Sequence, residues 1–184
     1  MNHSLGSRNC LFVIIFEILV LVCVINGDVH AGKKTRKEAG IDICKVEIPK
    51  NLESLSNPEL VNYIRRIRSM PFNRIQQGDD IAQAVLKRGS VIVTCLINNI
   101  TSNVNMCGDV ENVYGVDNRV GDIALYLIMD IMHLEFNQFL PKMRKDNDHL
   151  IVVDYLAFVK NSNNREKVKQ SLLKVFPEFN KKCE

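Results

Sequence analysis

Apolar residues recur at helical spacing along most of the chain after residue 55. Between residues 56 and 70 they fall three or four positions apart, which places them on one face of a helix: Leu60, Tyr63, Ile64 and Ile67. Ser56 or Asn57 is a suitable N-cap, and Pro58 stands in the first turn, where its missing N–H removes no helical hydrogen bond. We therefore predict an amphipathic helix over 56–70, ended by Pro71.

The stretch from residue 79 to residue 100 fits two structures. Residues 91–97 alone are β-branched and unbroken enough for a strand. Over the whole stretch, however, the apolar positions follow a helical spacing: Ile81, Val85, Gly89, Ile92, Leu96 and Ile100. We favour a helix that begins at a cap formed by Asp79 or Asp80.

Three further segments are predicted to be helical. Residues 122–140 are apolar almost all round, which is typical of a central helix, and Pro141 ends them. Residues 148–160 and 163–176 are amphipathic and follow Asn or Asp caps. A loop rich in Asn, Asp and Gly fills 101–118. The predicted fold class is therefore all-α, with five to six helices.

Residues 1–31 have the pattern of a secretory signal peptide. A short polar segment precedes an apolar run over 10–25, and Val29 and Ala31 occupy positions typical of a cleavage site. The run contains Glu17 and is shorter than the ~20 apolar residues of a membrane span. We predict cleavage after Ala31 and a secreted, extracellular protein without stable membrane insertion. Residues 32–43 would then form a basic, flexible tail.

The cysteine content and the charge of the exported chain limit the kinds of site and partner that it can have. Its cysteines are even in number, which predicts two disulfides formed in an oxidising compartment: Cys44, Cys95, Cys107 and Cys183. None of them is spaced as in a zinc site, and no phosphate-binding, serine-hydrolase or metalloprotease motif is present. The net charge of the full sequence, +3, is too small to indicate nucleic-acid binding. We therefore predict no enzyme activity, no cofactor, no metal and no nucleic-acid partner.

The chain contains one series of landmarks twice. The same number of residues separates the cysteine from the tyrosine in 44–63 and in 107–126, and an acidic residue stands four positions before each tyrosine. A Phe-Asn pair, a helical segment that ends in Leu-Lys and a cysteine then follow in both halves. Ordered landmarks of this kind indicate an internal repeat. We predict two related helical units, 44–106 and 107–184, with an extra helix inserted in the second.

Four cysteines allow three disulfide pairings. If each ancestral unit closed on itself, the bonds are Cys44–Cys95 and Cys107–Cys183, which is the simplest arrangement. Pairing across the units stays open, for example Cys44 with Cys183 and Cys95 with Cys107. Each closed loop would stabilise the fold by roughly 4 kcal/mol by reducing the entropy of the unfolded chain.

Two successive cysteine–tyrosine–cysteine units behind a signal peptide resemble the bicycle proteins, a family of secreted salivary effectors of aphids. The matching residues cover nearly the whole exported chain: Cys44, Tyr63, Cys95, Cys107, Tyr126 and Cys183. The resemblance implies a helical protein that is delivered with saliva into plant tissue and alters host cells. It brings no catalytic residues with it.

Polar side chains of the segment 122–140 form one stripe at helical spacing: Asp122, Tyr126, Asp130, His133 and Asn137. Such a stripe is either a pocket lining or pH-sensitive contact, or the one wetted edge of a buried helix, and we favour the wetted edge. Tyr63 and Tyr126 are expected to pack their rings in the core and to place each hydroxyl on a polar partner.

Two further features are candidates for surface contacts. Arg65, Arg66 and Arg68 form a basic cluster that suits an acidic or phosphate-bearing partner, although a solvated helix face is the commoner meaning of such a run. Asn99 begins the sequon Asn-Ile-Thr and is a candidate glycosylation site.

Two functions fit these observations. We favour a secreted, non-enzymatic effector that binds a host protein or another host macromolecule. The alternative is a secreted helical carrier of small apolar ligands, with a cavity lined by Met129, Met132, Phe136 and Phe139.

Overall fold

Helices make up the regular structure of this computed structural model, which describes residues 42–71, 78–111, 117–140 and 148–184. The α-helices are α2 (Asn57–Asn62), α3 (Asp80–Lys87), α4 (Val93–Asn99), α5 (Val120–Met132), α6 (Asp148–Val159) and α7 (Asn163–Val175). Short 3₁₀-helices add η1 (Leu52–Ser54), η2 (Tyr63–Arg66), η3 (Gly89–Ile92), η4 (Phe136–Gln138) and η5 (Pro177–Phe179). Within the described ranges no strand forms, so the predicted all-α class and the predicted number of helices are confirmed.

The predicted signal peptide, residues 1–31, and all but the end of the basic tail, 32–43, lie outside the described residues and stay predictions. The described residues belong to one unit, Ile41–Glu184. No helix in the described part of the chain is long and apolar enough to cross a membrane.

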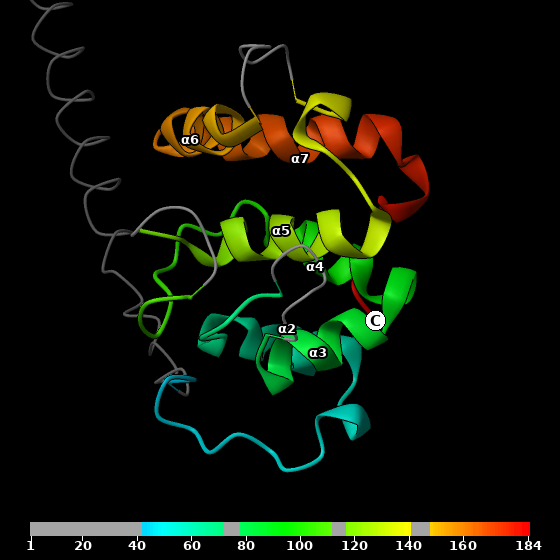
Figure 1. Ribbon diagram of the computed structural model, residues 1–184. Coiled ribbons are helices and arrows are strands. Elements are labelled where there is room, and N and C mark those ends of the chain that lie inside the picture. Colours follow the sequence, from blue (N-terminus) through cyan, green and yellow to red (C-terminus); the bar gives the residue numbers. More distant parts are fainter. Residues whose placement is uncertain (1–41, 72–77, 112–116, 141–147) are drawn as a thin grey trace, which may run out of the picture. The chain divides into compact units, whose positions relative to one another are not determined.

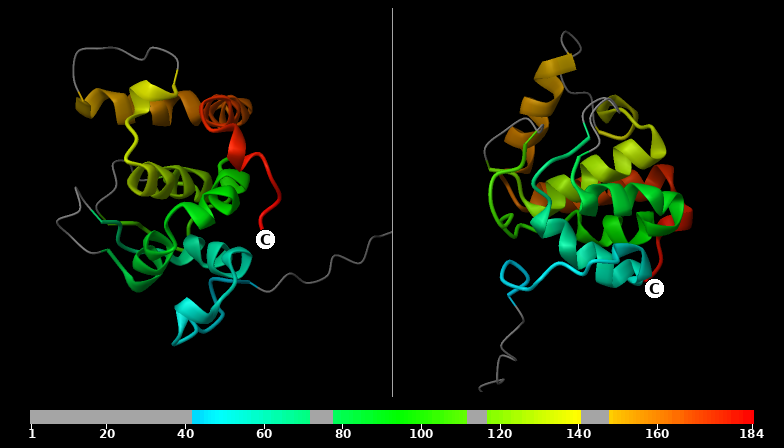
Figure 2. Two further views of the ribbon diagram at one scale, coloured as in Figure 1. Left: turned by 90° about the vertical axis from the view of Figure 1, so that its right-hand side faces the viewer. Right: turned by 60° about the horizontal axis from the view of Figure 1, so that its bottom comes forward.

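Helix α5 forms the centre of the core. It packs against α3 and α4, and Figures 1 and 2 show it between those helices and the α6–α7 pair. Nearly all of its first two turns is buried, as expected for a segment that is apolar almost all round. Side chains with no exposed surface include Leu60, Ile64, Ile67, Ile92, Leu96, Ile100, Ile123, Leu125, Leu127, Tyr155 and Leu172.

The predicted helix starts agree with the structure because local caps specify them. The hydroxyl of Ser56 accepts a hydrogen bond from the Glu59 N–H, and the Glu59 carboxylate accepts one from the Ser56 N–H at 2.8 Å. At α3, the carboxylate of Asp79 accepts a hydrogen bond from the Ala82 N–H at 2.9 Å.

The helix ends differ from the prediction because left-handed residues interrupt the chain. Gly89, with a φ of 58°, separates α3 from the continuation in η3 and α4. His133, with a φ of 56°, ends α5 directly after Met132. The first predicted helix also changes to 3₁₀ geometry at Tyr63. The strand alternative for residues 91–97 is wrong, since this segment is helical.

Both disulfides join the two expected units, so the favoured pairing within each unit is wrong. Cys44 pairs with Cys107, with Cα atoms 5.5 Å apart, and Cys95 pairs with Cys183, with Cα atoms 4.5 Å apart. The reason lies in the packing, because Cys95 is buried on α4 and η5 brings the C-terminal segment against that helix. The first cysteine of one unit thus bonds the first cysteine of the other, and the second bonds the second.

The two units agree where their tyrosine helices begin and differ afterwards. Glu59 and Asp122 are each the third residue of a helix, and each accepts a hydrogen bond from the N–H of its N-cap residue. Tyr63 follows the last residue of α2, however, while Tyr126 lies in the middle of α5. The internal duplication therefore stays a prediction.

Candidate functional site

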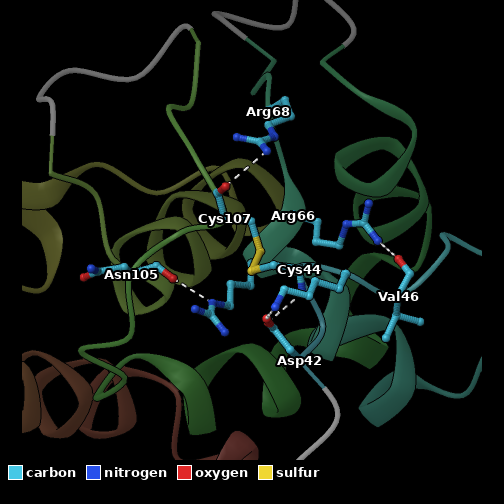
Figure 3. Close-up of a disulfide and its surroundings, with 9 residues drawn as sticks. Asp42, Cys44, Val46, Arg66, Arg68, Asn105 and Cys107 are labelled. Carbon is cyan, nitrogen blue, oxygen red and sulfur yellow. Dashed lines mark hydrogen bonds and ion pairs between the residues drawn. A yellow bond between two sulfur atoms is a disulfide. The ribbon is translucent and has the colours of Figure 1, made fainter.

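A run of three arginines lies near the Cys44–Cys107 disulfide, and Figure 3 shows two of them, Arg66 and Arg68, on either side of it. Each guanidinium donates a hydrogen bond to a backbone carbonyl of a flanking segment: Arg65 to Asn105 at 2.7 Å, Arg66 to Val46, and Arg68 to Cys107 at 3.1 Å. The segments that carry the two cysteines are thereby held to η2 and the turn after it. Hydrogen bonds from a charged donor are stronger than those between neutral groups, so these contacts reinforce the disulfide.

Backbone hydrogen bonds also fix this part of the chain. The Cys107 N–H donates to the Arg65 carbonyl at 2.9 Å, and the Glu111 N–H donates to the Arg68 carbonyl at 2.7 Å. Ile67 is fully buried, which leaves the neighbouring arginines on the outer side of the turn. The basic cluster therefore clamps the backbone of two segments in addition to supplying charge, and it is not a purely solvated helix face.

A cavity of about 610 Å³ lies beside these arginines. Its lining includes Lys50, Arg66 and Arg68, and none of these cations forms an ion pair with another described residue. Among the acids of the lining, Asp79 already accepts hydrogen bonds from backbone N–H groups, and Glu53 is paired with a lysine at 2.8 Å. Asp79 keeps its negative charge and Asp80 adds a second, so the lining retains a small positive excess from Lys50, Arg66 and Arg68. The cavity therefore suits an acidic or phosphate-bearing group.

A second polar cluster is buried where α5, α6 and α7 meet. The Asp122 carboxylate accepts hydrogen bonds from the Tyr155 hydroxyl at 2.9 Å, Nη2 of Arg165 at 3.0 Å and the Arg119 N–H at 2.7 Å. Nη1 of Arg165 also lies 2.8 Å from this carboxylate, which is an ion-pair distance without hydrogen-bond geometry. The side chains of Arg165 and Asp122 are only 3% and 1% exposed. The pair is therefore largely shielded from bulk solvent.

This cluster changes the interpretation of the polar stripe on residues 122–137. The favoured interpretation, that the stripe is a wetted edge, is wrong for Asp122, which lies in a buried ion pair. Because α5 ends at Met132, His133 and Asn137 are not on the same helix face, and both are exposed. The stripe is therefore not one continuous site.

Both tyrosines of the cluster are held neutral. Burial and then the charge of Asp122 raise the pKa of Tyr126, and the same two causes raise the pKa of Tyr155 well above its ordinary value. Burial alone would lower the pKa of Arg165, but the hydrogen bond and the charge of Asp122 raise it overall. The Tyr126 hydroxyl is buried without a hydrogen-bond partner among the described residues, so the expected polar partner is not found. These groups therefore form a fixed structural ion pair flanked by neutral phenols.

Tyr155 and Arg165 were not found by sequence reasoning. Arg165 stands three positions before Val168 and seven before Leu172, and both of these are buried. It therefore occupies a core position of α7, where a charged residue signals a buried ion pair. The spacing thus indicates that Arg165 is a buried charge. It does not indicate that Asp122 is the partner, because Asp122 lies far away in the sequence.

Asn99 is the last residue of α4 and is half-buried. Its side-chain amide donates a hydrogen bond to the Cys95 carbonyl at 2.9 Å. A glycan would be attached to this same nitrogen and would have to displace the contact. Glycosylation at Asn99 stays a prediction.

The aromatic residues proposed to line a ligand cavity pack together instead. The ring of Phe136 lies 5.2 Å from that of Tyr155 and 6.1 Å from that of Phe139. Phe136 and Phe139 are both buried, while Met129 and Met132 are partly buried against the same core. None of these four residues lines the cavity of about 610 Å³ or a second cavity of about 480 Å³ beside α6.

Among the residues that the structure places, no group of three or more His, Cys, Asp or Glu side chains is arranged to hold a metal ion. Comparisons with protein-family models, with curated proteins and with solved structures gave no match to this chain.

Proposed function

We propose that this protein is a secreted, non-enzymatic effector that binds an acidic or phosphate-bearing host macromolecule through the face around the Cys44–Cys107 disulfide. The observation that carries the proposal is the cavity of about 610 Å³ in which Lys50, Arg66 and Arg68 lack ionic partners among the described residues. A planar guanidinium offers several N–H donors, and only part of them is used by the backbone carbonyls.

The disulfides support a role outside the cell. Cys44–Cys107 spans 63 positions of the sequence and Cys95–Cys183 spans 88, and each is worth roughly 4 kcal/mol on a chain-entropy estimate. Disulfides form and persist in oxidising compartments. The protein would therefore persist among extracellular proteases while the disulfide keeps the cationic face assembled.

The resemblance to the bicycle proteins supports the biological setting of the proposal. Cysteine–tyrosine–cysteine units in this order are what that family of salivary effectors carries. We accordingly propose delivery in saliva to plant tissue, where binding to a host macromolecule alters host cells.

The test is chemical cross-linking of the oxidised full-length secreted chain to a host-plant extract, followed by identification of the cross-linked partner. Wild type is compared with Lys50→Glu and with the double variant Arg66→Glu/Arg68→Glu. The matched control is Lys167→Glu/Lys174→Glu, which changes the charge equally at exposed sites of α7. We expect one acidic partner to be recovered with wild type and control, and at least tenfold less of it with the cavity variants.

Lys50 makes the test robust because its exposed side chain forms no hydrogen bond or ion pair in the described ranges, so Lys50→Glu changes charge without loosening the clamp. Unfolding midpoints of all variants are measured alongside. A partner that binds every variant equally, or a repeated failure to recover any partner, would contradict the proposal.

A further inference from the structure

A second cavity, of about 480 Å³, lies between α6 and the segment that precedes α5. Val153, Leu156 and Ala157 of α6 contribute an apolar wall, and the buried Asp122–Arg165 pair lies at its base. This lining shares no residue with the cavity beside Arg66 and Arg68. We call it the α6 groove.

The wall of the α6 groove is apolar surface that is exposed among the described residues. The prediction that the helix over 148–160 is amphipathic is wrong, because α6 is apolar on nearly all sides. Burying Tyr155 and Val159 against the core therefore still leaves apolar side chains outside. Val153 is 55% exposed, Ala157 four positions later is exposed, and Leu156 between them is half-buried. Three apolar residues at this spacing lie on one side of the helix and form a short apolar strip.

The rim of the groove carries a small excess of positive charge. Arg119 and Lys160 both line the cavity, and neither forms an ion pair with any described residue. Asp117 lies on the same rim and offsets one of these charges. The remaining acid of the lining, Asp122, is already neutralised by Arg165. The groove therefore combines an apolar strip with an unneutralised cation at its edge.

We infer that the α6 groove docks a short amphipathic, acidic segment of a partner protein. An apolar side chain of that segment would pack on Val153, Leu156 and Ala157, and an Asp or Glu carboxylate next to it would meet Lys160 or Arg119. Charge complementarity of this kind fixes the orientation of a docked segment and raises its association rate. The inference rests on the proposed function, since it names a second contact by which an effector would hold a host protein.

The test is a selection of displayed twelve-residue peptides on the oxidised full-length secreted chain, followed by affinity measurements on the enriched peptides. We expect the enriched sequences to combine a large apolar residue with Asp or Glu. Val153→Asp and Lys160→Glu should each weaken the binding of these peptides at least tenfold. Raising the salt concentration should weaken binding to the wild type, because exposed charges are screened.

Matched controls separate the groove from the general surface. Val91→Asp replaces a valine that is 66% exposed on η3, and Lys167→Glu reverses an exposed lysine of α7, so neither should change peptide affinity. Unfolding midpoints are measured for every variant. If Val153→Asp lowers stability, Lys160→Glu still decides the result because its side chain is exposed.

Peptides without an acidic and apolar consensus, or binding that survives both groove variants, would overturn the inference. So would a fluorescent fatty acid that binds wild type and is lost on Val153→Asp, since the groove would then hold a lipid. If peptide selection fails while cross-linking still depends on Arg66 and Arg68, only the docking inference falls. If peptides bind the groove but the cross-linked partner is indifferent to those arginines, only the proposed function falls.

Discussion

The first turns of α2 and α5 contain the same hydrogen bond but lie at different depths in the molecule. In each helix an acid at the third position accepts from the N–H of the N-cap residue, at 2.8 Å for Glu59 and at 2.7 Å for Asp122. Glu59 is exposed, and its hydrogen bonds with Ser56 lower its pKa. Asp122 is buried and is the only carboxylate bound to Arg165 and Tyr155 in the described part of the chain.

The difference shows that a local capping residue specifies where a helix begins. The packing around that residue determines how much it contributes to the free energy of unfolding. When an exposed capping hydrogen bond is lost, water replaces it with a hydrogen bond of nearly the same strength. A buried carboxylate neutralises a guanidinium that water cannot reach, so that losing the carboxylate leaves an unpaired charge in the core. The two turns should therefore respond very differently to equivalent changes.

The largest effect is expected from Asp122→Asn. It removes the counter-charge of Arg165 inside the core, and breaking a buried pair from one side typically costs about 3–5 kcal/mol of unfolding free energy. Glu59→Gln, the matched change in α2, should cost far less. Urea unfolding of both variants measures this difference, and a double variant that adds Arg165→Met to Asp122→Asn should recover part of the loss. Equal losses for Glu59→Gln and Asp122→Asn would contradict the comparison.

Alkaline pH should reveal the buried tyrosines of the α5 cluster. Both folded phenols have raised pKa values, whereas tyrosines of the unfolded chain ionise near pH 10. Stability is therefore full below about pH 10 and falls as the pH rises toward the folded pKa, by about 1.4 kcal/mol per tyrosine and pH unit. Unfolding midpoints between pH 9 and 11 measure the slope.

Tyr126→Phe is the control for that slope. The Tyr126 hydroxyl has no hydrogen-bond partner among the described residues, so its removal should leave stability near neutral pH almost unchanged. The loss above pH 10 should become clearly smaller. A steep loss of stability near pH 7 would show instead that this hydroxyl makes a contact of its own.

A substitution at the second residue of α5 is expected to have an intermediate effect on stability, and the second residue of α2 provides the comparison. A Cβ on Gly121 of α5 would overlap the backbone carbonyl oxygen of Ile100, which cannot move as a side chain would. We expect Gly121→Ala to cost about 2 kcal/mol, in the range of overpacked cores. Pro58→Ala at the equivalent position of α2 should change the unfolding midpoint little. Thermal unfolding of the two variants tests this, and a harmless Gly121→Ala would argue against the close approach.

The smallest effect is expected from Ser56→Ala. This change removes the side-chain acceptor that caps α2 and should cost about 1 kcal/mol. Urea unfolding against wild type measures it, with Ser54→Ala in η1 as an exposed serine control that caps no α-helix. A loss as large as that of Asp122→Asn would mean that α2 carries more of the fold than its short length suggests.

The sequence predicts the helices of this protein well because their starts and apolar faces are local features. The caps at Ser56 and Asp79 and the apolar faces of both segments could be read directly. The break at Gly89 was missed because the apolar spacing continues through this glycine, although glycine is a local signal for a helix end. The early end of α5 at His133 had no such signal, since a histidine seldom adopts a left-handed backbone.

The candidate site was predictable only in part. The sequence showed the run of arginines, but their backbone partners Asn105 and Val46 lie on distant segments. The disulfide pairing failed for a related reason, since a repeat shows which cysteines are equivalent and not which of them meet in space. The α6 groove had no local signal, because it depends on where α6 packs.

The disulfides Cys44–Cys107 and Cys95–Cys183 tie the N-terminal part of the fold to its C-terminal part. Cyanogen bromide cleavage after methionine tests this directly, because Met70, Met106 and Met129 separate the cysteines into different fragments. Under non-reducing conditions we expect the fragment that ends at Met70 to be linked to 107–129, and 71–106 to be linked to 144–184. A bond between the fragment that ends at Met70 and 71–106, which would show that Cys44 pairs with Cys95, would contradict the account.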